Sequence, residues 1–164
     1  AFANGKWYWE VKITAGDNNL VGIANSDEQH RFTTTFGINN YSITAYGVNG
    51  HIFREGSTVE TSGVTYGAND IVGLAVDMDS GTRTVQFYKN GSSFGNAVTL
   101  PTNWGFTLPI IRKGGSSQTS SFNFGNPAFS ISSSNSDANG YGSFEYAVPS
   151  GYFALCTKNL AEYG

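Results

Sequence analysis

The sequence is poor in the features that mark several large classes of protein. It has one cysteine, Cys156, among 164 residues, so no disulfide can form within the chain. Charged residues make up only 13% of the chain and are scattered, and the net charge is −3. A protein that binds nucleic acid normally presents a basic face, so we expect no nucleic-acid partner. No run approaches the roughly 18 apolar residues of a membrane span, so we expect no membrane insertion either.

Helical periodicity is also missing, whereas glycine and aromatic residues are abundant. There are 21 glycines, and aromatic residues make up 15% of the chain. The segment "KWYWEVKIT" (6–14) alternates, which predicts a strand with one buried and one wetter face. The segment "DIVGLAVDM" (70–78) is apolar on both faces, as expected of a strand in the middle of a sheet sandwich. We therefore predict an all-β domain of two packed antiparallel sheets.

The stretch "VDMDSGTRTVQFYKNGSSFG" (76–95) superficially resembles a calcium-binding loop. Asp77 and Asp79 have the alternate spacing of oxygen ligands, but position 81 is glycine, and Tyr88 occupies the place of the bidentate glutamate. Asn-Gly at 90–91 is a strong hairpin signal, because both residues tolerate positive φ. We predict two successive turns of a β-meander at this stretch, and no metal site.

Catalytic groups are sparse and are not arranged in a recognisable motif. The only histidines are His30 and His51, and both fall in predicted loops. Cys156 lies in "FALCTK", in or beside a predicted strand, which is typical of a buried structural thiol. No phosphate-binding glycine motif is present, and the carboxylates of the loops are dispersed. We predict a protein that is not an enzyme and that needs no cofactor.

Five segments in this order resemble the SPRY domain: "GKWYWEVKI", "VGIAN", "DIVGLAVDMDSGTRTVQFYKNGSSFG", "LPIIR" and "FNFGNPAF". The resemblance covers roughly residues 5–129, and its most specific part is the block "VGLAVDMDSG…VQFYKNG". It implies a bent two-sheet antiparallel β-sandwich of the concanavalin-like jelly-roll kind. It also implies a binding module, usually for proteins or peptides, whose loops at one rim contact the partner.

We expect the 164 residues to form a single domain, excerpted from a larger chain, with a core at 5–129, a loop at 130–143 and a C-terminal strand and tail at 144–164. The segment "GYFALCTKNLAE" (151–162) resembles the ending of SPRY modules in bacteriophage structural proteins. That likeness implies a displayed part of a virion, in the tail or capsid, that mediates attachment or assembly. Outside a virion, the expected location is the cytoplasm, as a soluble protein.

Interface anchors are enriched in Trp, Tyr and Arg, and recognition residues concentrate on loops held by a rigid scaffold. In SPRY domains the segments after the "VGIA", "YS" and "PII" strands form one rim. The predicted partner-binding residues are His30, Arg31, Tyr46, His51, Arg54, Trp104 and Arg112. Trp104, between Pro101 and Gly105, is the strongest candidate for an exposed aromatic residue. The predicted partner is a protein or peptide surface, and the oligomeric state stays open.

A carbohydrate-binding module is the alternative. Aromatic side chains in loops stack on sugar rings in many lectins that share this sandwich architecture, and a host-surface glycan would be the ligand. The candidate stacking residues are Tyr46, Phe53, Trp104 and Tyr141.

Overall fold

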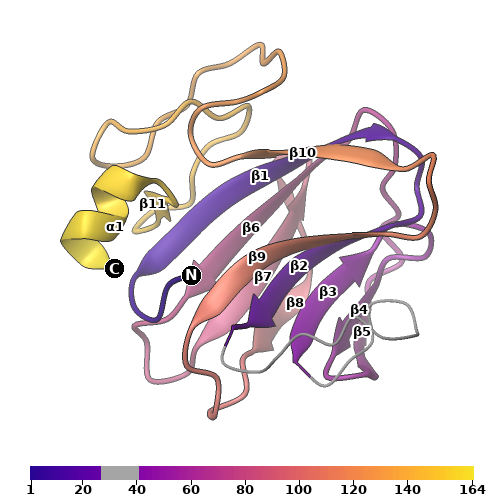
Figure 1. Cartoon of the computed structure of the whole chain (residues 1–164), viewed down its shortest axis with the longest axis horizontal. Coiled ribbons are helices and arrows are strands. Elements are labelled where there is room, and N and C mark those ends of the chain that lie inside the picture. Colours follow the sequence, from indigo (N-terminus) through magenta and orange to yellow (C-terminus); the bar gives the residue numbers. More distant parts are fainter. Residues whose placement is uncertain (27–40) are drawn as a thin grey trace.

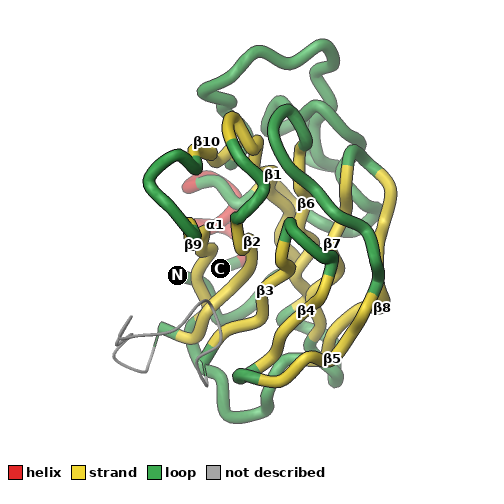
Figure 2. Tube along the Cα trace, turned by 90° about the vertical axis from the view of Figure 1, so that its right-hand side faces the viewer, coloured by secondary structure: helices red, strands yellow, loops and turns green. Residues whose placement is uncertain are grey.

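The computed structural model describes residues 1–26 and 41–164, which form two antiparallel sheets packed face to face (Figures 1 and 2). The six-stranded sheet contains β1 (Lys6–Ala15), β6 (Ile71–Asp77), β7 (Thr84–Lys89), β8 (Ser92–Thr99), β10 (Thr119–Asn123) and β11 (Phe153–Ala154). The five-stranded sheet contains β2 (Asn19–Asn25), β3 (Ser42–Tyr46), β4 (His51–Arg54), β5 (Ser57–Thr61) and β9 (Thr107–Lys113). The predicted all-β sandwich is confirmed.

The strand orders are β10-β1-β6-β7-β8 in the first sheet and β5-β4-β3-β2-β9 in the second. The short strand β11 pairs parallel with β1, at Trp7 and Tyr8. A single helix, α1 (Thr157–Tyr163), follows β11 in the described residues. No helix in the described part of the chain is long and apolar enough to span a membrane.

The main core lies between the two sheets and follows the alternation of β1. Trp7, Trp9, Val11 and Ile13 are fully buried on its inner face, as the sequence predicts. They pack against inner-face residues of the opposite sheet, including Val21, Ile23 and Ile43. Burial of these apolar side chains is the main source of stability in a sandwich.

The strand β6 is buried along its whole length between β1 and β7, which confirms that it lies in the middle of a sheet. On the outer face of β6, a small residue leaves space for a side chain of the neighbouring strand. A Cβ at Gly73 would lie 2.8 Å from the hydroxyl oxygen of Tyr8 on the neighbouring strand β1. Glycine at position 73 therefore leaves room for the phenol of Tyr8.

The outer face of β1 differs from the prediction of a wetter face. Tyr8 is only 2% exposed and Glu10 is fully buried, because the C-terminal segment, defined as residues 130–164, covers this face (Figure 1). Phe144 and Ala154 of that segment pack against Tyr8, and the rings of Phe144 and Tyr8 meet edge to face at 5.2 Å. Alternation along a strand predicts which of its faces packs against the opposite sheet. It does not predict whether a segment distant in the sequence covers the other face.

The buried carboxylate of Glu10 is satisfied by the C-terminal segment. It accepts hydrogen bonds from the backbone N–H groups of Glu145 (3.1 Å) and Tyr146 (2.9 Å). The amide of Asn123 and the hydroxyl of Tyr8 donate two more. Burial raises the pKa of the Glu10 carboxyl above its ordinary value, although these hydrogen bonds oppose the rise. Two of these four donors, the N–H groups of Glu145 and Tyr146, belong to the C-terminal segment and fix how it sits on the sheet.

The 130–143 loop has almost no regular structure, as its Ser- and Asn-rich composition predicts, yet one of its side chains is buried. Asp137 is 6% exposed. Its carboxylate accepts hydrogen bonds from the backbone N–H groups of Asn139, Tyr141 and Ala154 and from the side-chain amide of Asn159. A single carboxylate thus ties the loop to β11 and α1.

The stretch that resembled a calcium loop forms two turns of a meander, β6-β7-β8, as predicted. Asp77 holds the first turn by accepting hydrogen bonds from the N–H groups of Asp79 and Ser80, and it pairs with Lys6 at 2.7 Å. Asp79 accepts a hydrogen bond from the N–H of Gly5. The second turn has φ of 48° at Asn90 and 82° at Gly91. Within residues 1–26 and 41–164, no three His, Cys, Asp or Glu side chains gather as metal ligands.

Candidate binding surface

Three of the predicted contact residues lie in one row across the outer face of the five-stranded sheet. Leu20 on β2 pairs with Tyr46 on β3 and with Arg112 on β9. Ala45 pairs with Ile52, so the same register places His51 beside Tyr46. Residues in register on adjacent strands project to the same face. We call this set the outer row: Arg112, Leu20, Tyr46 and His51. In Figure 1 the sheet that carries it lies in front of the β6-β7-β8 layer.

The outer row is partly open to solvent and is held by local contacts. Leu20 is buried at its centre, whereas Tyr46, His51 and Arg112 are half-buried. The hydroxyl of Tyr46 donates a hydrogen bond to the side-chain oxygen of Asn18 at 3.0 Å. The imidazole of His51 lies 6.1 Å from the ring of Phe53, two residues along β4 on the same face. An aromatic ring, an imidazole and a guanidinium together suit a peptide with apolar and acidic side chains.

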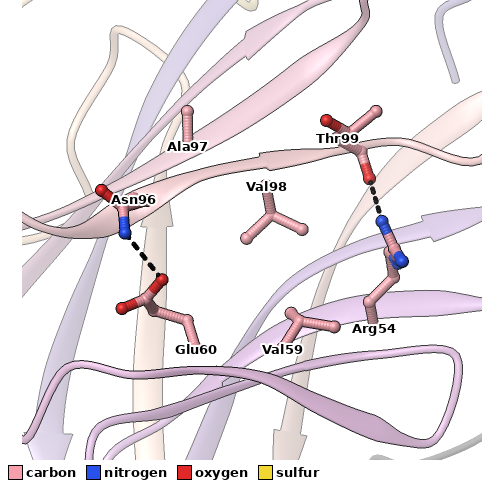
Figure 3. A pocket seen from close by; sticks show the side chains of 7 residues that line it. All are labelled: Arg54, Val59, Glu60, Asn96, Ala97, Val98 and Thr99. Carbon is pink, nitrogen blue, oxygen red and sulfur yellow. Dashed lines mark hydrogen bonds between the residues drawn. The ribbon is translucent and has the colours of Figure 1, made fainter.

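Arg54 is not part of the outer row. It pairs with Ile43, whose side chain lies in the core, so Arg54 projects from the inner face of the sheet at its edge. Its guanidinium Nη1 donates a hydrogen bond to the backbone oxygen of Thr99 on β8, at 3.2 Å (Figure 3). The residues predicted to share one rim therefore lie on two different surfaces. Arg54 projects from the inner face of the sheet and His51 from the outer face, because side chains alternate along a strand.

Arg54 lines a groove on the open side of the sandwich, which we call the edge groove. Its volume is about 350 Å³. Figure 3 shows Val98 and Val59 projecting into it, with Glu60 and Asn96 at the end opposite Arg54 and Thr99. The β8 residues of this groove are not among the predicted contact residues, because alternation along one strand does not indicate which distant strand lies beside it. The groove is lined by Arg54, Val59, Glu60, Asn96, Ala97, Val98 and Thr99.

The prediction that Trp104 is an exposed aromatic residue is wrong. Trp104 is 2% exposed and belongs to the main core. Its backbone oxygen accepts a hydrogen bond from Arg83 at 2.7 Å, and its indole N–H points to the Glu55 carboxylate at 3.4 Å. Arg83 also donates to the backbone oxygens of Pro101 and Thr102, so one guanidinium folds the 101–104 turn inward. Trp104 therefore cannot contact a partner directly.

The remaining candidates lie apart from the outer row or outside the described residues. His30 and Arg31 fall within 27–40, outside the described ranges. Tyr141 lies in the C-terminal segment, where the Lys158 ammonium sits 4.1 Å above its ring. Of the four candidate stacking residues, only Tyr46 and Phe53 share the outer face of the five-stranded sheet.

Comparison with known proteins agrees with this architecture. The crystal structure of the SPRY domain of human HERC1 superposes with a TM-score of 0.56 at 15% sequence identity, covering 74% of each chain, which shows a shared fold. No curated protein matches the sequence. The SPRY domain family model matches residues 6–127, which include every strand from β1 to β10. The chain therefore belongs to the SPRY domain family, whose members are generally non-catalytic protein-binding modules.

Proposed function

We propose that this SPRY domain binds a protein or peptide partner through the outer row. The observation that carries the proposal is the register of β9, β2, β3 and β4. It places Arg112, Tyr46 and His51 in one row, with Leu20 between Arg112 and Tyr46, although Arg112 comes from a segment far from the other two in the sequence. Sandwich strands hold these side chains in fixed positions, and such preorganisation lowers the entropic cost of binding. His30 and Arg31, predicted to belong to the same surface, remain part of the proposal.

The chemistry of the outer row favours recognition over catalysis. His51 lies on the five-stranded sheet, whereas Cys156, the only thiol, precedes α1 beside the six-stranded sheet. Among the described residues, the Cys156 thiol and the His51 imidazole thus do not form a pair of nucleophile and base. Arginine and tyrosine, by contrast, are among the side chains that most often dominate protein interfaces, and the outer row contains one of each.

We further propose that the domain is a displayed part of a bacteriophage virion, where it mediates attachment or assembly. The likeness of residues 151–162 to the ending of SPRY modules in phage structural proteins supports this context. That segment is docked on the domain: Leu155 reaches the main core, and Asn159 is buried against Asp137. Mass spectrometry of purified virions tests the proposal, and absence of the peptide 151–162 from tail and capsid proteins would contradict it.

A host-surface glycan is the second candidate ligand. Tyr46 and Phe53 are half-buried on the same face, so part of each ring is available for stacking against a sugar. A glycan would depend on Tyr46 and Phe53 and tolerate the loss of Arg112, whereas an acidic peptide would depend on Arg112.

The experiment that tests the outer row is a parallel screen of a displayed peptide library and a glycan array with the purified domain. Ligands that emerge are then measured against Tyr46→Ala, His51→Ala and Arg112→Ala. We expect each change to weaken binding about tenfold, equivalent to about 1.4 kcal/mol, with the melting temperature shifted by no more than a few degrees. Lys158→Ala, an exposed change beside the other sheet, is the control. Unchanged binding by all three variants would contradict the proposal.

A further inference from the structure

The open side of the sandwich brings together the terminal strands of both sheets. β5 ends the five-stranded sheet and β8 ends the six-stranded sheet. The two strands lie side by side in Figure 2 and contact each other. Residues of both strands line the edge groove. Terminal strands carry backbone N–H and C=O groups without a neighbouring strand, which makes them templates for another extended chain.

The backbone of β8 presents such groups to the edge groove. The N–H of Leu100 donates to the backbone oxygen of Arg83 at 2.9 Å, which sets the hydrogen-bonding phase of the β7–β8 pair. In an antiparallel pair the backbone groups of successive residues alternate in direction. Thr99 and Ala97 therefore turn their N–H and C=O groups away from β7, toward the open side. The hydrogen bond from Arg54 to the Thr99 oxygen confirms this direction.

The side chains of the groove combine an apolar centre with two ends of opposite charge. Val59 is 38% exposed and projects toward Val98 (Figure 3). Arg54 occupies one end, and Glu60, which accepts a hydrogen bond from the Asn96 amide at 3.0 Å, occupies the other. The ion pairs of the described residues are Lys6–Asp77 and Lys89–Asp70, so neither Arg54 nor Glu60 has an ionic partner within those ranges.

We propose that the edge groove binds an extended segment of a partner protein, which adds to β8 as a further strand. The occupant carries an acidic side chain opposite Arg54, a small apolar side chain over Val59 and Val98, and a basic side chain opposite Glu60. Charge complementarity selects this occupant. Arg54 uses one of its five N–H donors on Thr99 and keeps others for a carboxylate. Main-chain hydrogen bonds supply affinity and the alternate side chains supply specificity, as in other cases of strand addition.

The spacing of the groove fits such a segment. Arg54 is opposite Ser57 across the β4–β5 hairpin, and Glu60 lies three residues further along β5. Three residues of strand span about 10 Å. In an extended peptide, side chains on one face recur about every 7 Å, so a basic residue, a valine and an acidic residue at alternate positions span about 14 Å. The long side chains of Arg54, Glu60 and the basic residue accommodate the difference of about 4 Å from the groove. This surface is distinct from the outer row, which lies on the outer face of the five-stranded sheet.

The test uses the peptide acetyl-Lys-Thr-Val-Thr-Asp-amide, titrated into the uniformly ¹⁵N-labelled domain and followed by NMR. We expect the largest amide shifts at Ala97, Thr99 and Val59. A matched peptide with a C-terminal lysine in place of the aspartate should bind about tenfold more weakly, because it lacks the carboxylate for Arg54. Arg54→Gln should remove that difference between the peptides.

Two further variants separate this proposal from the outer row. Thr99→Pro removes the outward N–H of β8 without removing a hydrogen bond to β7, and should abolish peptide binding. Arg112→Gln should leave it unchanged. Shifts confined to the outer row, equal affinity for the two peptides, or unaltered binding by Thr99→Pro would overturn the proposal. So would a concentration-dependent dimer with shifted β8 amides in the absence of peptide, which would assign the edge to a second copy of the chain. If Thr99→Pro does not fold, the Arg54→Gln comparison decides.

Discussion

The carboxylate of Glu10 accepts a hydrogen bond from the backbone N–H of Tyr146, a residue 136 positions further along the chain, at 2.9 Å. The neighbouring N–H of Glu145 binds the other carboxylate oxygen at 3.1 Å. One buried carboxylate on β1 thus binds the backbone of the C-terminal segment at residues 145 and 146, where this segment covers the outer face of the six-stranded sheet. The SPRY family match ends at residue 127, so this segment is an addition to the matched core.

Glu10→Gln should loosen the C-terminal segment. A glutamine keeps one acceptor oxygen but places an N–H₂ group against N–H donors, which leaves at least one buried donor unsatisfied. We expect a loss of about 1–3 kcal/mol in the free energy of unfolding, measured by urea denaturation. Glu162→Gln, an exposed change in α1, is the matched control and should alter stability by less than about 0.5 kcal/mol. Equal effects of the two changes would show that the Glu10 network does not hold the segment.

Tyr8→Ala should be far more destabilising than Tyr46→Ala. Tyr8 is 2% exposed between Gly73 and Phe144, so its removal leaves a cavity, at a cost of about 3–5 kcal/mol. Tyr46 is half-buried on the outer row, and its loss should cost about 1 kcal/mol. Thermal and urea unfolding of both variants measure the difference. A small effect at Tyr8 would mean that the C-terminal segment does not cover β1 in solution.

Asp77→Asn should make the domain less stable at neutral pH but not at pH 2. Burial alone would raise the pKa of Asp77, but the hydrogen bonds from Lys6 and Ser80 outweigh it and lower the pKa to about 2. An unfolded aspartate titrates near pH 3.9, at roughly its reference value. The stabilisation is therefore present above about pH 4 and is lost as the pH falls toward 2.

The melting temperatures of wild type and Asp77→Asn, measured from pH 7 to pH 2, should converge at the acid end. Asp17→Asn provides the control, because Asp17 is exposed and its carboxylate forms no ion pair within the described residues. A gap between wild type and Asp77→Asn that stays constant over this range would contradict the assignment.

Gly91→Ala should destabilise the β7–β8 hairpin, whereas Gly81→Ala should not. Gly91 has φ of 82°, and an added Cβ would lie 2.6 Å from the ring of Tyr146. Strain and overlap together should cost about 1–3 kcal/mol. A Cβ at Gly81 meets no atom within 4 Å, so that variant serves as the control in the same meander. If the two substitutions had equal effects on the urea midpoint, the turn geometry at Asn90 and Gly91 would be wrong.

The sequence predicts part of the proposed binding surface, the outer row. Interface anchors are enriched in tyrosine and arginine, which indicates Tyr46 and Arg112, and the sequence groups His51 with Tyr46. Pairing across β9, β2, β3 and β4 places the three in one row. The same reasoning failed for Trp104, because a short turn beside proline and glycine reads as exposed. The three hydrogen bonds by which Arg83 draws that turn inward join residues 18 to 21 positions apart, and no local pattern encodes them.

The sequence by itself determined the all-β class, the inner face of β1, the central place of β6 and the two turns of the β6-β7-β8 meander. These features depend on alternation and on the backbone preferences of neighbouring residues, which are local. Only the tertiary structure decided that Tyr8 and Glu10 are buried, that Arg54 faces β8, and that Asp137 orders the 130–143 loop. Each of these depends on contact between segments that are distant in the chain. Such contacts form only after the sheets have packed together, so no local sequence pattern encodes them.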